Sequence, residues 1–179
     1  MPVVVLHGTL GSPGNFERLA HALAAQGRRV IGFEYGDRGT ADLARSTAEV
    51  ADFLGQFELV DVIGHSLGGL MGLRAAHIHG NVRTLIGLGA AWRGVPATPF
   101  PRLLEWVAGP AFRQLQTRFE ARVPARTRVV SIISDADTVV PAWSSTLGEI
   151  IRLSGVHHAH LPNQVEVIAK ALKSFPQKD

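Results

Sequence analysis

The chain has 179 residues, 46% of them hydrophobic and 18% charged, and its formal net charge is +3. This length and composition are typical of one packed globular domain and exclude a disordered chain, while the absence of cysteine excludes disulfides and thiolate catalysis. Fifteen of the eighteen basic residues are arginines scattered along the chain, which indicates a solvated surface and argues against a nucleic-acid-binding protein.

In the first half of the chain, short apolar runs alternate with segments whose apolar residues recur at helical spacing. Ser12 followed by Pro13 is a typical start of a helix, and Gly27 is a typical end. The pattern predicts strands at 3–6, 28–35 and 59–64, alternating with helices between Pro13 and Gly27, at 41–54 and at about 67–79.

The second half predicts strands at 82–89 and 127–133, a short strand at 149–153 and a closing helix at 163–175. Strands separated by helices imply βαβ units and a mostly parallel sheet. We therefore predict an α/β fold in one domain over residues 1–179, with about six mostly parallel strands and helices on both faces. Because this class of fold serves many functions, the function has to be argued from the site.

The segment VIGHSLGGLMGL at residues 62–73 joins the third predicted strand to its helix and contains Gly64, Ser66 and Gly68 in the pattern Gly-x-Ser-x-Gly. A nucleophilic serine at the end of a parallel strand has to project its hydroxyl above the sheet, which requires a sharp turn with small neighbours. The same spacing occurs by chance in structural turns, but here the strand, turn and helix that the motif requires are all present. We interpret Ser66 as a nucleophile.

A serine hydroxyl is a weak nucleophile at neutral pH, so it needs a base and an orienting carboxylate, expected in the chain order Ser, acid, His. The loop after the fifth strand offers Asp135 and Asp137, of which Asp137 is favoured because a Val-Pro step follows it as an apolar anchor, whereas Asp135 fits a turn-capping role. The loop after the sixth strand offers His157, His158 and His160 as bases. No carboxylate accompanies these histidines at the spacing of a metal site, so we expect no metal.

A tetrahedral intermediate also needs hydrogen-bond donors for its oxyanion. The backbone amide of Leu67, directly after the serine, is one expected donor. The second should come from the loop LHGTLG after the first strand, where Gly8 and Gly11 let the backbone turn inward and Thr9 is the expected donor.

Five segments in this order carry a resemblance to a known family: VVVLHGTLGSPGNF, VDVIGHSLGGLMGL, LIGLGAAWRGVPA, SDADTVVP and GVHHAHLP. Over about residues 2–175 the sequence resembles the α/β-hydrolase family, and more narrowly the small bacterial lipases and esterases of the class 2 type. The resemblance implies a minimal α/β-hydrolase fold and a serine esterase or lipase that uses an acyl-enzyme intermediate and no cofactor. It also implies a triad of Ser66, Asp137 and His158, although His157 stands where the family usually has a glycine.

The segment 92–126, between the fourth and fifth strands, is long for the smallest lipases and contains apolar clusters broken by prolines. It either packs onto the core or forms a small helical cap over an acyl pocket, with transient contact to a lipid surface. We expect substrate contacts from residues beside the nucleophile and in this cap: Leu10, His65, Trp92, Leu103, Trp106, Val107 and Val139. Phe112, Leu115 and Phe119 recur at helical spacing.

The expected substrate is a small-molecule or lipid ester, and the expected state is a monomer. The same triad would serve a thioesterase, amidase, lactonase or acyltransferase, and a catalytically silent binding protein is a third hypothesis, against which the complete Ser, Asp and His set argues. No apolar run approaches the roughly 20 residues of a membrane span, and strand-like residues start at position 2 in place of a signal peptide. We therefore expect a cytoplasmic protein, or a secreted one if this is a mature form.

Overall fold

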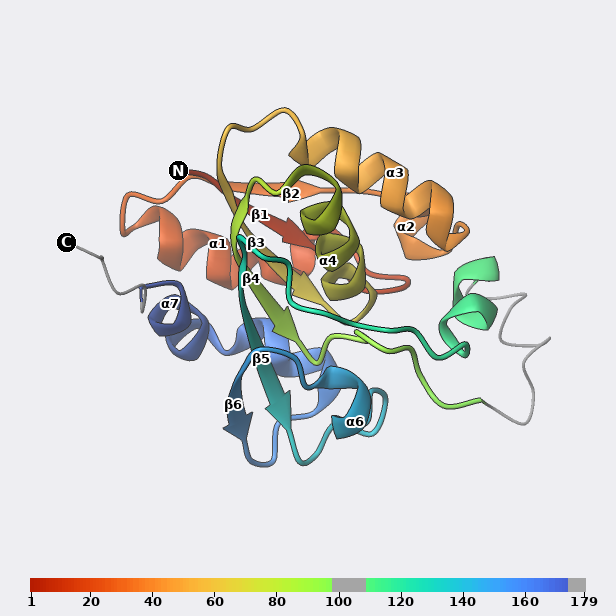
Figure 1. The fold of residues 1–179 in the computed structure, drawn as a ribbon. Helices are drawn as coiled ribbons and strands as arrows, with labels where there is room; N and C mark the ends of the chain where they lie inside the picture. The colour runs from red at the N-terminus through yellow and green to blue at the C-terminus, as the bar shows by residue number, and fades with distance from the viewer. Residues whose placement is uncertain (98–108, 174–179) are drawn as a thin grey trace.

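A computed structural model describes residues 1–97 and 109–173 of the chain. Its centre is a six-stranded sheet in the order β2-β1-β3-β4-β5-β6, in which every neighbouring pair is parallel (Figure 1). The strands are β1 (Val3–Leu6), β2 (Val30–Phe33), β3 (Val60–His65), β4 (Val82–Leu88), β5 (Arg128–Ser134) and β6 (Glu149–Leu153). The predicted α/β fold with a parallel sheet is confirmed.

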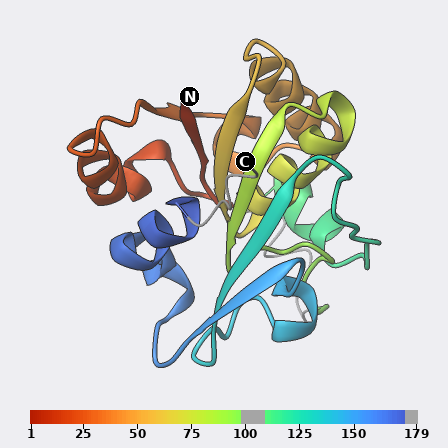
Figure 2. The same cartoon turned by 60° about the vertical axis from the view of Figure 1, so that its left-hand side comes forward.

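Helices cover both faces of this sheet because its central strands are apolar on both sides. The α-helices are α1 (Glu17–Ala24), α2 (Gly36–Gly39), α3 (Leu43–Leu54), α4 (Leu67–His79), α6 (Ala142–Ser145) and α7 (Val165–Lys173). Figure 2 shows α1 and α7 together on one face and α3 and α4 on the other. Each pair packs its own apolar core against the sheet.

Several boundaries differ from the sequence-based expectations for physical reasons. The strand expected at 28–35 is shorter because β2 is an edge strand that pairs only with the four residues of β1. The helix expected after Ser12 begins as a 3-10 turn, η1 (Pro13–Phe16), before α1. The short helices α2 and α6 and the 3-10 turn η2 (His158–Asn163) were not expected, because four to six residues are too few to show a helical period. The last residues of the expected closing helix lie outside the described residues.

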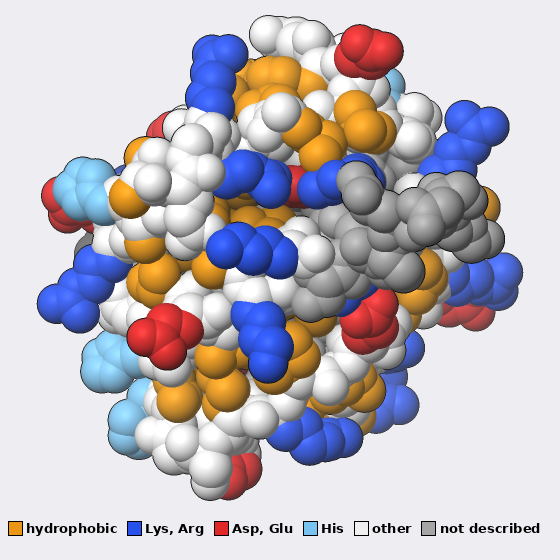
Figure 3. Space-filling model, turned by 90° about the vertical axis from the view of Figure 1, so that its left-hand side faces the viewer, with side chains coloured by type: hydrophobic (Ala, Val, Ile, Leu, Met, Phe, Trp, Pro, Cys, Tyr) orange, Lys and Arg blue, Asp and Glu red, His pale blue; other side chains and the backbone are white. Residues whose placement is uncertain are grey.

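Outside the core, the charged groups follow the scattered pattern that the sequence indicated. Figure 3 shows the side of the molecule that carries α1 and α7, where Lys and Arg side chains are dispersed among uncharged groups.

At the amino end of β3 the fully buried Asp61 accepts hydrogen bonds from Arg28 and Arg83, so its charge is compensated inside the fold. Within 1–97 and 109–173, no helix is long and apolar enough to cross a membrane.

The topology brings three loops to one edge of the sheet. In a parallel sheet the carboxyl ends of all strands lie at the same edge. The strands β3, β5 and β6 end at this edge and are separated only by β4, which lies between β3 and β5. Ser66 directly follows β3, Asp137 follows β5, and His158 follows β6 as the first residue of η2. The fold therefore places the three residues in adjoining loops.

Candidate active site

Ser66 occupies a strained turn between β3 and α4. Its φ of 53° and ψ of −117° lie in a region that residues other than glycine rarely adopt. Backbone hydrogen bonds hold this conformation: the Ser66 amide donates to the carbonyl of Leu88 (3.0 Å), and the amides of Gly69 (3.2 Å) and Ala91 (3.1 Å) donate to the carbonyl of Ser66. Strain of this kind persists where the surrounding structure imposes it, and it is common at functional sites.

The glycines on either side of Ser66 are required by close packing. A Cβ on Gly64 would collide with the backbone of Gly68 and Gly69, and a Cβ on Gly68 would collide with the carbonyl oxygen of Leu6. The helix α4 can therefore lie directly against β1 and β3 only because both positions lack a side chain. This is the steric reason for the Gly-x-Ser-x-Gly spacing.

His158 and Asp137 form a hydrogen-bonded pair beside the serine turn. Nδ1 of His158 lies 2.7 Å from Oδ2 of Asp137. The other carboxylate oxygen accepts hydrogen bonds from the backbone amides of Val139 and Val140, both at 2.9 Å. With its Nδ1 proton directed at the carboxylate, the neutral imidazole carries its lone pair on Nε2. That is the form in which a histidine accepts a proton from a hydroxyl.

The surroundings of Asp137 keep it ionised. Burial by itself raises the pKa of this carboxyl, but the hydrogen bonds from His158, Val140 and Val139 outweigh burial, and the pKa is lowered. An ionised carboxylate at this place orients the imidazole of His158 and stabilises its protonated form.

Gly89, at the end of β4, is a further requirement of this pair that sequence reasoning missed. Its φ is +51°, and a Cβ there would lie 2.6 Å from Oδ2 of Asp137 and 3.0 Å from Nδ1 of His158. Only glycine leaves the space in which the two side chains meet. The glycine was visible in the sequence as the end of a strand, but the nearness of the two loops was not.

The competing candidates point elsewhere. Asp135 accepts hydrogen bonds from the Ser154 hydroxyl and the Gly155 amide, each at 2.7 Å, and so caps the turn after β6. The rings of His157 and His160 face each other edge to face, with centroids 6.4 Å apart. Of the two candidate acids, Asp135 and Asp137, and the three candidate histidines, His157, His158 and His160, the described structure joins an acid to a histidine only at Asp137 and His158.

The loop after β1, residues 8–11, which we refer to as the β1 loop, lies beside the serine turn: a Cβ on Gly8 would lie 3.1 Å from the Cβ of Ser66. Its Leu10 amide donates to the carbonyl of Arg38 (2.8 Å), and its Gly11 amide donates to the carbonyl of Gly8 (3.0 Å). Within the described part of the chain, the Thr9 amide has no such acceptor. The amide of Leu67, as the first residue of α4, also has no partner inside its helix.

His65, the residue before the serine, is a buried neutral imidazole. Its Nε2 lies 3.0 Å from the carbonyl oxygen of His158, and the two rings are 4.6 Å apart. Burial, together with the neighbouring His158, lowers the pKa of His65 to about 3. Because Nε2 faces a carbonyl acceptor, it carries the proton, so His65 donates to the backbone of His158.

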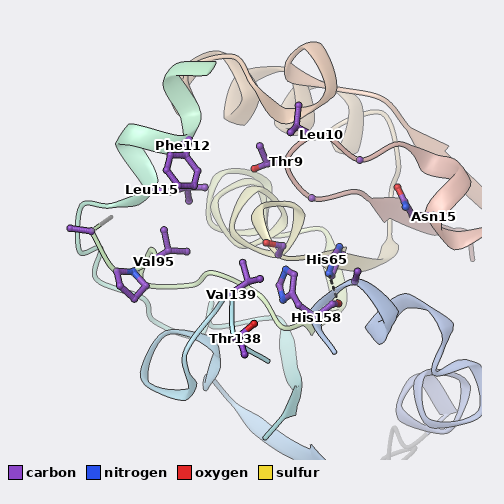
Figure 4. Close-up of a pocket in the computed structure, with 16 residues that line it drawn as sticks. Thr9, Leu10, Asn15, His65, Val95, Phe112, Leu115, Thr138, Val139 and His158 are labelled. Atoms are coloured by element: carbon purple, nitrogen blue, oxygen red, sulfur yellow. Dashed lines mark hydrogen bonds between the residues drawn. The ribbon is translucent and has the colours of Figure 1, made fainter. Parts of the chain in front are cut away.

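These residues open onto one cavity of about 560 Å³ (Figure 4). Ser66, His158, Thr9 and the expected substrate contacts Leu10, His65 and Val139 all line it. Its other lining residues are Gly8, Gly11, Asn15, Val95, Pro96, Ala97, Phe112, Leu115, Thr138 and Ala159. One wall is apolar, and in Figure 4 Phe112 and Leu115 point into the cavity from the helical segment 109–115.

One expected substrate contact is corrected. Trp92 is fully buried and does not line the cavity. Its indole packs on Gly69 and Gly87, and Nε1 donates to the Ser131 hydroxyl and the Ser145 carbonyl. Because both the ring and its N–H are satisfied inside the domain, Trp92 is a core residue.

The segment 92–126 is described only in part. Leu103, Trp106 and Val107 lie outside the described residues. The helical segment 109–115 includes Phe112 and Leu115, but Phe119 lies beyond its end, where it stacks under the guanidinium of Arg74. The helical spacing expected for all three therefore holds for two of them.

Comparison with known proteins identifies the fold family of the chain. A sequence model of the α/β hydrolase fold matches residues 1–162. The chain is 28% identical over 146 residues to sn-1-specific diacylglycerol lipase ABHD11 of Xenopus laevis, an overlap that covers 75% of this chain and 47% of that protein. The chain thus spans about half the length of this curated relative.

Solved structures with the same fold include lipases. A monoacylglycerol lipase of Paleococcus ferrophilus matches with a TM-score of 0.67 at 18% identity, covering 95% of this chain and 91% of that one. Lipase B of Aspergillus fumigatus matches with a TM-score of 0.70 at 17% identity, covering 89% of this chain and 49% of that one. The chain belongs to the α/β hydrolase fold family, as the five sequence motifs indicated.

Proposed function

We propose that this protein is a serine carboxylic-ester hydrolase, of the esterase or lipase type. The observation that carries the proposal is the joint opening of Ser66, on its strained turn, and of His158, bound to Asp137, into one largely apolar cavity. The lipase relatives support an ester of a small molecule or lipid as the substrate.

In the proposed reaction, Nε2 of His158 takes the hydroxyl proton as Oγ of Ser66 bonds to the ester carbonyl carbon. The carbonyl electrons move to oxygen and form an oxyanion. When they return, the bond from carbon to the alcohol oxygen breaks, and His158 passes its proton to the leaving alcohol. Water, deprotonated by the same histidine, then attacks the acyl carbon, the bond from that carbon to Oγ of Ser66 breaks, and His158 returns the proton to Oγ as the acid leaves. Asp137 holds the imidazole in the required tautomer and stabilises its charge.

The amides of Thr9 and Leu67 are the proposed donors to the oxyanion. Their support is that the Leu10 and Gly11 amides donate to backbone carbonyls, whereas the Thr9 and Leu67 amides have no backbone acceptor among the described residues. The two residues also adjoin: a Cβ on Gly39 would lie 3.2 Å from a side-chain methyl of Leu67 and 3.3 Å from the Cα of Thr9.

The apolar wall is the proposed acyl site. Val95, Phe112 and Leu115 line it, as do Val139 and Leu10. An acyl chain placed against Phe112 and Leu115 would leave the water-exposed side of the cavity for the alcohol. The role of segment 92–126 as a cap over this site remains a proposal, as does its contact with a lipid surface.

The experiment is fluorophosphonate labelling together with p-nitrophenyl ester turnover in the wild type, Ser66→Ala and the control Ser154→Ala. Ser154 is an exposed serine bonded to Asp135, so its loss should leave both readouts unchanged. Ser66→Ala should abolish labelling and lower turnover by at least about 10⁴-fold. Turnover in Ser66→Ala within tenfold of the wild type would contradict the proposal. Thioesters and amides of the same acyl groups are assayed in parallel. Faster turnover of the esters than of these substrates distinguishes an ester hydrolase from a thioesterase or an amidase.

A further inference from the structure

Four consecutive residues between β2 and α3 adopt left-handed backbone conformations. The φ values are +58° at Gly36, +48° at Asp37, +61° at Arg38 and +72° at Gly39. The segment labelled α2 is therefore a left-handed turn, which costs glycine little but is unfavourable for Asp37 and Arg38. Strained backbone at two adjacent residues persists only where contacts with the surrounding structure impose it, and the contacts of this turn indicate its role.

Hydrogen bonds and ion pairs connect the turn to residues of α3. The Gly36 amide donates to Oε2 of Glu49 (2.6 Å), and Asp37 forms an ion pair with Arg45 (2.9 Å). Arg45 also pairs with Glu49 (2.8 Å), and so links the two anchors. The turn is thus held by a helix that belongs to the core and takes no part in lining the cavity.

Arg38 in the same turn forms hydrogen bonds with the β1 loop. The backbone carbonyl of Arg38 accepts from the Leu10 amide (2.8 Å), while Nη2 of Arg38 donates to the Leu10 carbonyl (2.6 Å) and Nε donates to the Gly11 carbonyl (3.3 Å). Leu10 itself is left-handed, with a φ of +60°. One arginine therefore binds both polar groups of a strained residue that directly follows Thr9.

Close packing completes the contact. A Cβ on Gly39 would lie 3.4 Å from the Gly8 carbonyl oxygen as well as against Thr9 and Leu67, so the end of the turn rests on the β1 loop and on the start of α4. The left-handed path of the turn brings Gly39 into this position and directs the Arg38 carbonyl and guanidinium at Leu10.

We propose that Arg38 is a positioning residue that holds the β1 loop so that the Thr9 amide is aimed at the oxyanion. The inference rests on the proposed function, in which that amide stabilises the transition state. Arg38 does not line the cavity, so it acts through Leu10 and Gly11 and not on the substrate. A donor that is misaligned weakens transition-state stabilisation more than substrate binding, so kcat should fall with little change in KM.

The test compares Arg38→Ala, Arg38→Gly and Arg38→Lys with the control Arg122→Ala, which removes an exposed guanidinium that pairs with the exposed Glu120. Arg38→Gly is the decisive variant because it loses the guanidinium and also relieves the left-handed strain. Its Tm should stay within about 4 °C of the wild type, while kcat for p-nitrophenyl esters falls about 10- to 100-fold and KM stays within about twofold. Arg38→Lys, which keeps one cationic donor for the Leu10 carbonyl, should recover part of the lost kcat.

A second readout is independent of turnover: amide hydrogen exchange at Leu10 and Gly11 should be at least about tenfold faster in Arg38→Ala and Arg38→Gly than in the wild type and the control. Unchanged exchange in both variants would overturn the proposal. So would a fall in kcat in Arg38→Gly accompanied by a fall in Tm of more than about 4 °C, because general destabilisation would then account for the lost activity. If the wild type neither turns over esters nor is labelled by a fluorophosphonate, the proposed function fails. The exchange rates still decide whether Arg38 holds the loop.

Discussion

Nε2 of His65 donates a hydrogen bond to the backbone carbonyl of His158 across 3.0 Å, while the side chain of His158 is held by Asp137. His158 is therefore positioned twice, through its main chain by one histidine and through its ring by one carboxylate. The two imidazoles lie 4.6 Å apart, and two positive charges at that separation in a buried place would repel each other. The structure resolves this by keeping His65 neutral.

The first prediction concerns the pH dependence of stability. The pKa of His65 is about 3 in the folded chain, below its ordinary value of 6.5. As the pH falls below 6.5, the His65 imidazole becomes protonated in the unfolded chain but stays neutral in the folded chain. The free energy of unfolding therefore declines across the window from about pH 6.5 to 3. Between pH 7 and about pH 4.5, this loss should amount to about 2 to 3 kcal/mol.

His65→Gln tests this prediction because the glutamine amide can still donate to the His158 carbonyl but does not titrate. Its free energy of unfolding in urea should fall less on acidification than that of the wild type, by about 2 kcal/mol. Equal falls in the two proteins would show that His65 does not carry the effect.

The second prediction concerns Asp137→Asn. An asparagine amide would donate to Nδ1 of His158 and so select the tautomer with the proton on Nε2, which cannot accept the serine proton. The value of kcat should drop on the order of 10²- to 10⁴-fold with KM little changed. The matched control is Asp135→Asn, two residues away, which should retain activity within threefold because the Asp135 carboxylate accepts hydrogen bonds from Ser154 and Gly155 in the turn after β6.

The third prediction separates backbone strain from crowding at Gly89. Gly89→Ala adds a methyl group 2.6 Å from Oδ2 of Asp137, and it should lower both kcat and stability, the latter by about 1 to 3 kcal/mol. Gly27→Ala introduces comparable strain at φ +75°, but its methyl group would meet nothing within 4 Å. Gly27→Ala should therefore lose stability alone. Thermal melts and ester kinetics of both variants measure the difference, and full activity in Gly89→Ala would refute the steric argument.

The fourth prediction assigns Trp92 to the core and Phe112 to the cavity. Trp92→Phe removes a buried N–H donor and leaves Ser131 and Ser145 without it, so stability should fall by about 1 to 3 kcal/mol at unchanged KM. Phe112→Ala should act in the opposite way and raise KM for long acyl chains more than for acetate, because it removes apolar surface from the wall. A KM change confined to Trp92→Phe would reverse the two assignments.

Much of the fold follows from local patterns. The alternation of apolar runs with helix-period segments is enough to predict the six strands and their parallel pairing, because each strand and helix displays its own period within a few residues. The serine turn is equally local, since Gly64, Ser66 and Gly68 are neighbours in the chain and the steric need for glycine arises within the turn. Edges such as β2 were less predictable, because their length depends on the partner strand.

The relations between distant segments were decided by the tertiary structure alone. Whether Asp137 meets His158 or a neighbouring histidine depends on how the loops after β5 and β6 pack around Gly89, which no stretch of sequence displays. Trp92 looked like a binding-site aromatic until its indole proved to be satisfied inside the core. Arg38 carried no sequence signal, because its role depends on a left-handed turn that reaches Leu10 across 28 residues. The sequence by itself determined the elements and the serine turn, since short-range sterics govern both; the packing of remote loops determined the rest of the site.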